Sequence, residues 1–137
     1  MPPEQQRADA PLRWLRNARA DLALAGVALP PGGLYEHLCF HAHQAAEKSL
    51  KAVLLRMGVE FPFTHNLQAL FDLLPAELEV PSRILEAVDL NPYAVSTRYP
   101  GEIETVTESD YVDAVRLAEA VTDWAAGIVQ HEGPASS

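Results

Sequence analysis

Apolar side chains recur every three to four residues along most of the chain, which is the spacing of amphipathic helices. The first such segment covers about residues 10–29 and is stopped by the run Pro30-Pro31-Gly32-Gly33. A second helix is predicted over about residues 34–57, followed by Gly58, a residue suited to a left-handed cap. Because the connection between the two helices is short, we expect them to lie antiparallel.

Three more helices are predicted in the second half of the chain. A short third helix, with Thr64 or Asn66 as its cap, has apolar residues at helical spacing: Leu67, Leu70, Phe71 and Leu74. The fourth begins near Pro81 and is kinked or divided by Pro92. The fifth begins at Thr107-Glu108-Ser109-Asp110, which resembles a capping box. This pattern predicts an all-α fold, an up-and-down antiparallel bundle of four to five helices.

Composition narrows the class of protein. A chain of 137 residues is most simply one domain, with loose tails expected at residues 1–9 and 132–137. A net charge of −9 argues against a broad nucleic-acid surface, but leaves room for a local basic pocket at Lys48 and Lys51, the only two lysines. The single cysteine, Cys39, allows no internal disulfide and is expected to be buried. With neither a signal pattern nor a long apolar run, we expect a soluble, cytoplasmic protein that does not enter a membrane.

One side of the second helix combines residue types that a merely solvated surface seldom brings together. On a helical wheel one narrow stripe carries Phe40, Gln44, Glu47 and Lys51, and His37, His41 and Lys48 lie beside it. The opposite side is rich in alanine and leucine. We therefore expect the mixed side to face outward, toward a ligand or a second subunit, and the apolar side to pack within the monomer.

Two interpretations of this stripe stay open. In the first, Lys48 and Lys51 neutralise a phosphate, Gln44 contacts a base or a sugar, and Phe40 stacks on a ring. In the second, Glu47 and Lys51 form an i, i+4 ion pair worth about 0.3–0.5 kcal/mol, within one subunit or across a dimer.

Further candidates lie outside the stripe. His37 and His41 are one turn apart, but no third ligand is near in sequence, so no metal site is predicted. His65 precedes a helix and is suited either to a hydrogen bond at the turn or to a contact with a ligand. Arg98 can pair with a carboxylate or hold a phosphate, and Tyr99 can stack on a base or close the end of the bundle.

Three pieces of sequence occur in a fixed order: residues 40–52, Thr64-His65-Asn66-Leu67 and Arg98-Tyr99-Pro100. Together they resemble the HEPN domain family, and the resemblance extends from the Trp14-Leu15 helix through the last helix. It implies a nucleotide-binding helical bundle that often dimerises. It also implies a frequent genomic neighbour, a minimal nucleotidyltransferase, in toxin–antitoxin or related modules.

Many members of that family are metal-independent RNases with an arginine followed four to six residues later by a histidine. No histidine lies in that range after Arg98, and Arg56 lies nine positions before His65. We therefore expect a module that binds a nucleotide, an RNA phosphate or a partner protein, without a cofactor. Its candidate ligand-binding residues are His41, Gln44, Glu47, Lys48, Lys51, His65, Arg98 and Tyr99.

Two alternatives to this binding module stay open. One is an RNase toxin with a non-standard site, in which His41 or His65 acts as general acid or base and Arg98 holds the phosphate. The other is an inert dimerising scaffold. In every case the expected oligomer is a homodimer.

Overall fold

The computed structural model describes residues 2–95 and 105–130, and every regular element within these two ranges is a helix. The elements are α1 (Pro3–Gln6), α2 (Ala10–Ala25), α3 (Tyr35–Arg56), α4 (Leu67–Asp72), α5 (Ser82–Leu85), a 3₁₀ helix η1 (Glu86–Tyr93) and α6 (Glu108–Val129). The predicted all-α class is confirmed.

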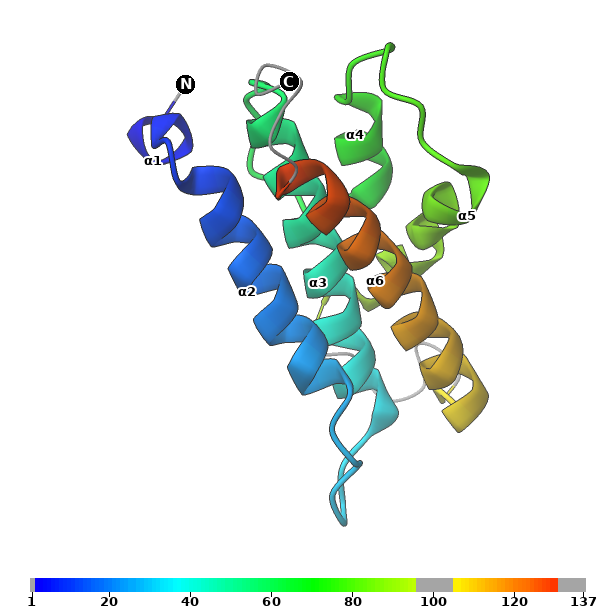
Figure 1. Cartoon of the computed structure of the whole chain (residues 1–137). Coiled ribbons are helices and arrows are strands. Elements are labelled where there is room, and N and C mark those ends of the chain that lie inside the picture. The colour runs from blue at the N-terminus through cyan, green and yellow to red at the C-terminus, as the bar shows by residue number, and fades with distance from the viewer. Residues whose placement is uncertain (1, 96–104, 131–137) are drawn as a thin grey trace.

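The long helices α2, α3 and α6 form the body of the molecule (Figure 1). α2 and α3 run antiparallel, as the short connection between them required, and α6 packs against both. α6 points the same way as α3, because α4, α5 and η1 lead the chain back to the lower end of the view before α6 begins. The short helices α4, α5 and η1 thus take the place of one antiparallel helix in an up-and-down bundle.

The apolar side of α3 lies at the centre of the core. Its small residues Ala42, Ala45 and Ala46 are fully buried, as are Cys39 and Leu50. Small side chains let the neighbouring helices approach closely, so α3 can contact α2 on one side and α6 on the other. The prediction that this side packs within the monomer is confirmed, and so is the burial of Cys39.

Local signals set most helix ends. Gly58 has φ +77°, the left-handed conformation predicted after α3. Asn66 caps α4 by accepting a hydrogen bond from the Gln68 amide, and Thr107 and Asp110 form the complete capping box of α6. α2 is shorter than predicted and stops at Ala25, because Gly26 favours leaving the helix one turn before the proline run.

The start of the chain differs from the expected loose tail. Residues 3–6 form α1, and the buried Gln5 side chain makes two hydrogen bonds with the backbone of Phe61. Its Nε2 donates to the Phe61 carbonyl at 3.3 Å, and its Oε1 accepts from the Phe61 amide at 3.3 Å. The expectation for residues 1–9 is therefore wrong at α1, and the expected tail at 132–137 lies outside the described residues.

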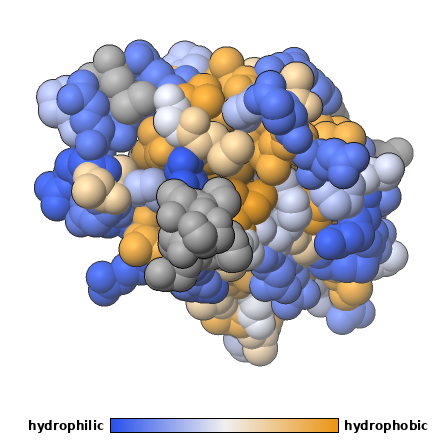
Figure 2. All heavy atoms as spheres, turned by 45° about the horizontal axis from the view of Figure 1, so that its top comes forward, coloured by the Kyte–Doolittle hydropathy of each residue, from blue (hydrophilic) through white to orange (hydrophobic). Residues whose placement is uncertain are grey.

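Figure 2 shows the upper end of the bundle, where hydrophobic side chains gather toward the middle and hydrophilic ones form most of the rim. Among the described residues with large apolar side chains, Phe63 is the most exposed at 90%, and it lies in the loop between α3 and α4. No helix in the described part of the chain combines the length and the apolar character that a membrane span requires.

Candidate functional site

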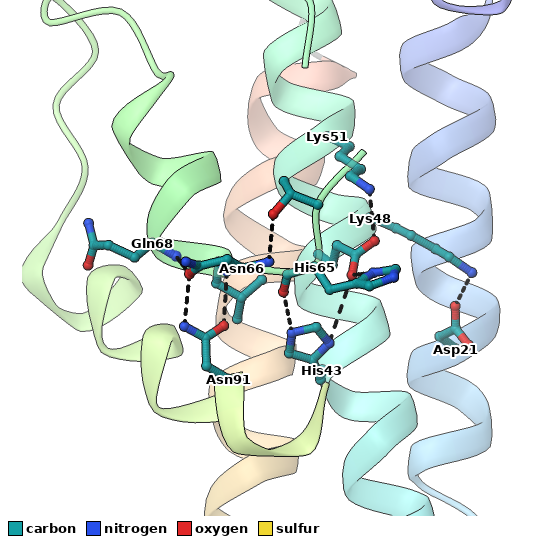
Figure 3. Close-up of polar contacts among 11 residues, drawn as sticks. Asp21, His43, Lys48, Lys51, His65, Asn66, Gln68 and Asn91 are labelled. Carbon is teal, nitrogen blue, oxygen red and sulfur yellow. Dashed lines mark hydrogen bonds and ion pairs between the residues drawn. The ribbon is translucent and has the colours of Figure 1, made fainter. Parts of the chain in front are cut away.

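Glu47 on α3 is the centre of a buried ionic cluster, and its partners Lys51 and His65 are labelled in Figure 3. Its Oε2 accepts a hydrogen bond from Lys51 Nζ at 2.8 Å, and its Oε1 lies 2.8 Å from His65 Nδ1. A carboxylate can only accept, so Nδ1 of the His65 ring carries the proton. In the neutral ring Nε2 is then the basic nitrogen, and 46% of the His65 side chain is exposed.

Lys51 lies inside this cluster instead of on the surface, with 4% of its area exposed. Its ammonium lies 5.5 Å from the ring centroid of Trp14 on α2 and 5.2 Å from that of Phe61. Two aromatic faces and the Glu47 carboxylate thus replace water around the charge. The expectation that Lys51 faces outward, toward a ligand or a second subunit, is wrong, and the structure shows the i, i+4 ion pair within one subunit.

His43 lies next to Glu47 on α3 and connects this helix to the loop between α3 and α4. It is fully buried, and its Nε2 donates a hydrogen bond to the His65 carbonyl at 2.9 Å. Burial lowers the pKa of His43, an effect that the nearby Glu47 charge opposes only in part. The ring is therefore neutral, with its Nδ1 lone pair 3.9 Å from Glu47 Oε1.

Asn66 and Asn91 fix the backbone that directly follows His65. Asn91 of η1 accepts a hydrogen bond from the Leu67 amide at 2.9 Å and donates one to the Asn66 side chain at 3.1 Å (Figure 3). The backbone around His65 is thus fixed to α3 through His43 and to η1 through Asn91. This rigid backbone presents the ring in one orientation.

A second cluster with the same pattern bridges α2 and α3. Asp21 is buried on α2, and it accepts hydrogen bonds from Lys48 Nζ at 2.6 Å and from His41 Nδ1 at 3.0 Å. One third of the His41 side chain is exposed (33%). His41 and His65 therefore share one arrangement, in which a buried carboxylate holds Nδ1 while the ring remains accessible to solvent.

Gln44 and Phe40 lie on the same side of α3 and are half-buried. The Oε1 atom of Gln44 is buried and has no hydrogen-bond partner among the described residues. The Phe40 ring meets the His41 ring edge-on, with centroids 5.3 Å apart. These two side chains fill the surface beside His41.

The predicted ligand-binding residues thus divide into two clusters, Gln44, whose side chain makes no hydrogen bond to the described residues of either, and a pair outside the described residues. Glu47, Lys51 and His65 form the first cluster, and His41 and Lys48 belong to the second. Arg98 and Tyr99 lie outside the described residues. Within the described ranges, no group of three histidine, cysteine, aspartate or glutamate side chains is arranged to hold a metal ion.

Sequence analysis missed Asp21, His43 and the aromatic residues around Lys51. Asp21 carried a signal, because it is an acid between Ala18 and Ala25 on the apolar side of its helix. The aromatic contacts carried none, because Trp14 on α2 and Phe61 in the loop after α3 lie on other elements and meet Lys51 only in the folded chain.

The fold and the two clusters define an all-helical module with a histidine-bearing face, formed by His41 on α3 and His65 in the loop after it. Comparison with known proteins gives its family. The sequence model of the HEPN domain matches residues 12–129. The chain belongs to the HEPN domain family. No curated protein matches the sequence.

Two solved structures share the fold. The crystal structure of TT1696 from Thermus thermophilus is 31% identical, with a TM-score of 0.74, and the match covers 85% of this chain and 96% of that chain. The crystal structure of ST0689, an archaeal HEPN homologue, is 28% identical, with a TM-score of 0.68, and the match covers 87% of this chain and 97% of that chain.

Proposed function

We propose that this protein is a HEPN-type module that binds the phosphate groups of a nucleotide or of RNA at His41 on α3 and His65 in the loop that follows α3. The observation that supports this most is the repeated arrangement of the two histidines. Each has its Nδ1 held by a buried carboxylate, Glu47 or Asp21, and each ring remains partly exposed. Two imidazoles fixed in this way can each offer an Nε2 atom to a phosphate oxygen.

The ion pairs of the two clusters leave the histidine rings available to a ligand. Lys51 pairs with Glu47, and Lys48 pairs with Asp21, so the carboxylate charges are already matched within the protein. A phosphate oxygen accepts hydrogen bonds, and an imidazole with a proton on each nitrogen can keep its Nδ1 contact with the carboxylate while Nε2 donates to the phosphate.

This arrangement makes His41 and His65 the residues on which the binding of RNA depends. We expect replacement of either ring to weaken the binding of a short single-stranded oligoribonucleotide without terminal phosphates about tenfold, the equivalent of about 1.4 kcal/mol.

The test is an NMR titration in which amide shifts are followed as the RNA is added. The variants His41→Gln and His65→Gln should each bind the RNA about tenfold more weakly than the wild type. The matched control is His37→Gln, which removes another histidine from the same helix. An absence of shifts at millimolar RNA, or an equal loss in the His37 control, would contradict the proposal.

We also propose that the module forms a homodimer and works with a minimal nucleotidyltransferase in a toxin–antitoxin-type pair. Membership of the family supports this partner, and the exposed Phe63 offers an apolar contact beside the site. The Phe63 ring meets the His65 ring edge-on at 5.1 Å. Co-expression with a nucleotidyltransferase encoded in the same operon, followed by size-exclusion chromatography, tests it. Separate elution of the two proteins would argue against the pairing.

The RNase alternative is supported by one specific observation, the contact between His65 and Glu47. A carboxylate that orients a histidine through Nδ1 is the arrangement of a general base. Purified protein can be incubated with total RNA beside the variants His41→Ala, His65→Ala and Arg98→Ala. Cleavage that all three variants retain would remove this candidate.

A further inference from the structure

A pocket of about 500 Å³ lies between α1, α2 and the side chain of Lys48. Its lining includes Arg7, Arg13, Trp14, Asn17, Lys48 and Glu4. We propose that this pocket binds a nucleotide, with the phosphate at the cationic side chains and the base against Trp14. The proposal rests on the proposed function for the class of ligand, but it places the ligand at a different site.

The cationic side chains keep donors that the protein does not use. Arg7 gives Asp9 two N–H groups, at 3.0 and 3.3 Å, and Lys48 gives Asp21 one. Arg13 is exposed and makes no ion pair in the described part of the chain. With Asp9 and Asp21 included, the positive charge of the pocket is largely balanced. Recognition therefore depends on directed hydrogen bonds to a compact phosphate rather than on bulk charge.

The aromatic wall is held in place from behind. The Trp14 ring meets Phe61 edge-on at a centroid distance of 5.4 Å, and the Lys51 ammonium lies over it. A fixed ring loses little freedom when a flat base stacks on it. Asn17 adds a polar group, because its Nδ2 donates to the Arg13 carbonyl at 2.9 Å while its Oδ1 remains to accept a hydrogen bond from the ligand.

The outer wall of the pocket comes from α1. Its position depends on Gln5, whose two hydrogen bonds to Phe61 hold Glu4 and Arg7 beside α2. α1 precedes residue 12, where the match to the HEPN domain begins. The pocket is thus built partly from residues outside the family match, which distinguishes it from the histidine-bearing face.

Three small probes test the two parts of the proposed ligand separately and together. Adenosine carries the base, inorganic phosphate carries the anion, and AMP carries both. Trp124→Phe leaves Trp14 as the only tryptophan, so its fluorescence reports on the pocket in the full-length protein. We expect AMP to quench Trp14 and to bind at least tenfold more tightly than adenosine or phosphate. RNA oligonucleotides with and without a 5′-phosphate determine whether the ligand is a free nucleotide or an RNA end.

Arg13→Gln is the decisive variant, because an exposed side chain without an ion pair can be replaced without disturbing the fold. We expect it to weaken the binding of AMP, or of the 5′-phosphorylated RNA, at least tenfold. Arg83→Gln, which removes the same charge from an exposed position on α5, is the control and should change the affinity less than twofold. Circular dichroism verifies that both variants are folded.

Failure of this proposal can be told apart from failure of the proposed function. Equal affinities of the Arg13 and Arg83 variants, or no Trp14 response to any phosphorylated probe, would overturn the pocket. If His65→Gln nevertheless weakens the binding of RNA, the proposed function at His41 and His65 is supported and only the pocket is contradicted. Conversely, if Arg13→Gln loses AMP binding while His65→Gln binds RNA as tightly as the wild type, the pocket is supported and the histidine-bearing face is contradicted.

Discussion

At the scale of single residues, the decisive feature is that Lys51 and Glu47 are charged and buried together. Each charge is compensated by the other and by the groups around it, namely His65 at the carboxylate and two aromatic rings at the ammonium. Such a pair contributes little when intact compared with an apolar pair, but removal of one partner leaves the other buried and uncompensated.

Lys51→Met should therefore lower the free energy of unfolding by about 3 kcal/mol or more, because Glu47 remains in the core without its partner. The double variant Glu47→Gln with Lys51→Met should recover much of this loss. Urea denaturation measures both. Arg116→Met, which removes a cation from an exposed pair with Asp113, is the control and should cost less than about 0.5 kcal/mol. Equal losses at the buried and the exposed pair would contradict the burial of Lys51.

His43 makes stability depend on pH. Its pKa is lowered by burial in the folded protein, so at mildly acidic pH the unfolded chain binds more protons than the folded one. The free energy of unfolding should consequently fall as the pH drops below about 6.5, by up to about 1.4 kcal/mol per pH unit.

The comparison for this prediction is His43→Gln, whose amide can still donate to the His65 carbonyl. Carboxylates that titrate in both proteins cancel in the difference between the two stability curves. A difference that does not change between about pH 7 and pH 5 would show that His43 is not a buried neutral ring.

At the scale of the helices, end signals proved as informative as hydrophobic spacing. α6 begins where its capping box predicted, since Thr107 and Asp110 each satisfy a backbone amide of the other. α2 ends earlier than its apolar pattern suggested, because the pattern continues through Val27 and Leu29 after the backbone has left the helix at Gly26. Periodicity locates a helix, and caps locate its ends.

Thr107→Ala removes the cap of α6 and should cost about 1 kcal/mol of stability. Ser109→Ala, two positions further along and exposed, is the matched control and should have a much smaller effect. Thermal or urea unfolding gives both values. A loss at Ser109 as large as that at Thr107 would mean that the capping box does not form.

At the scale of the whole molecule, the sequence predicted the structural features that depend on neighbouring residues. It did not predict the features that depend on contacts between different elements of the fold. The bundle, the cap at Asn66 and the apolar side of α3 all follow from residues close in sequence. The burial of Lys51 does not, because it depends on Phe61 and on Trp14, which meet Lys51 only in the folded chain. The pocket at α1 was missed for the same reason, since Gln5 and Phe61 are 56 residues apart.

The contact between Gln5 and Phe61 also gives a test of the whole-molecule arrangement. Gln5→Ala should free α1, and trypsin should then cut after Arg7 several-fold faster, while the free energy of unfolding falls by only about 1–2 kcal/mol. Glu4→Ala, on the same helix but exposed, is the control. If both variants are cleaved at the rate of the wild type, α1 is not held by Gln5.

The unequal surroundings of the two lysines reach beyond stability. Lys48 remains partly open to solvent, whereas Lys51 is enclosed by the rings of Trp14 and Phe61 and by the Glu47 carboxylate. An acylating reagent, or an enzyme that acetylates proteins, therefore meets a native chain with a single accessible lysine side chain. Among the lysine side chains, attachment of a dye or a crosslinker to the folded protein would be directed to Lys48 on α3.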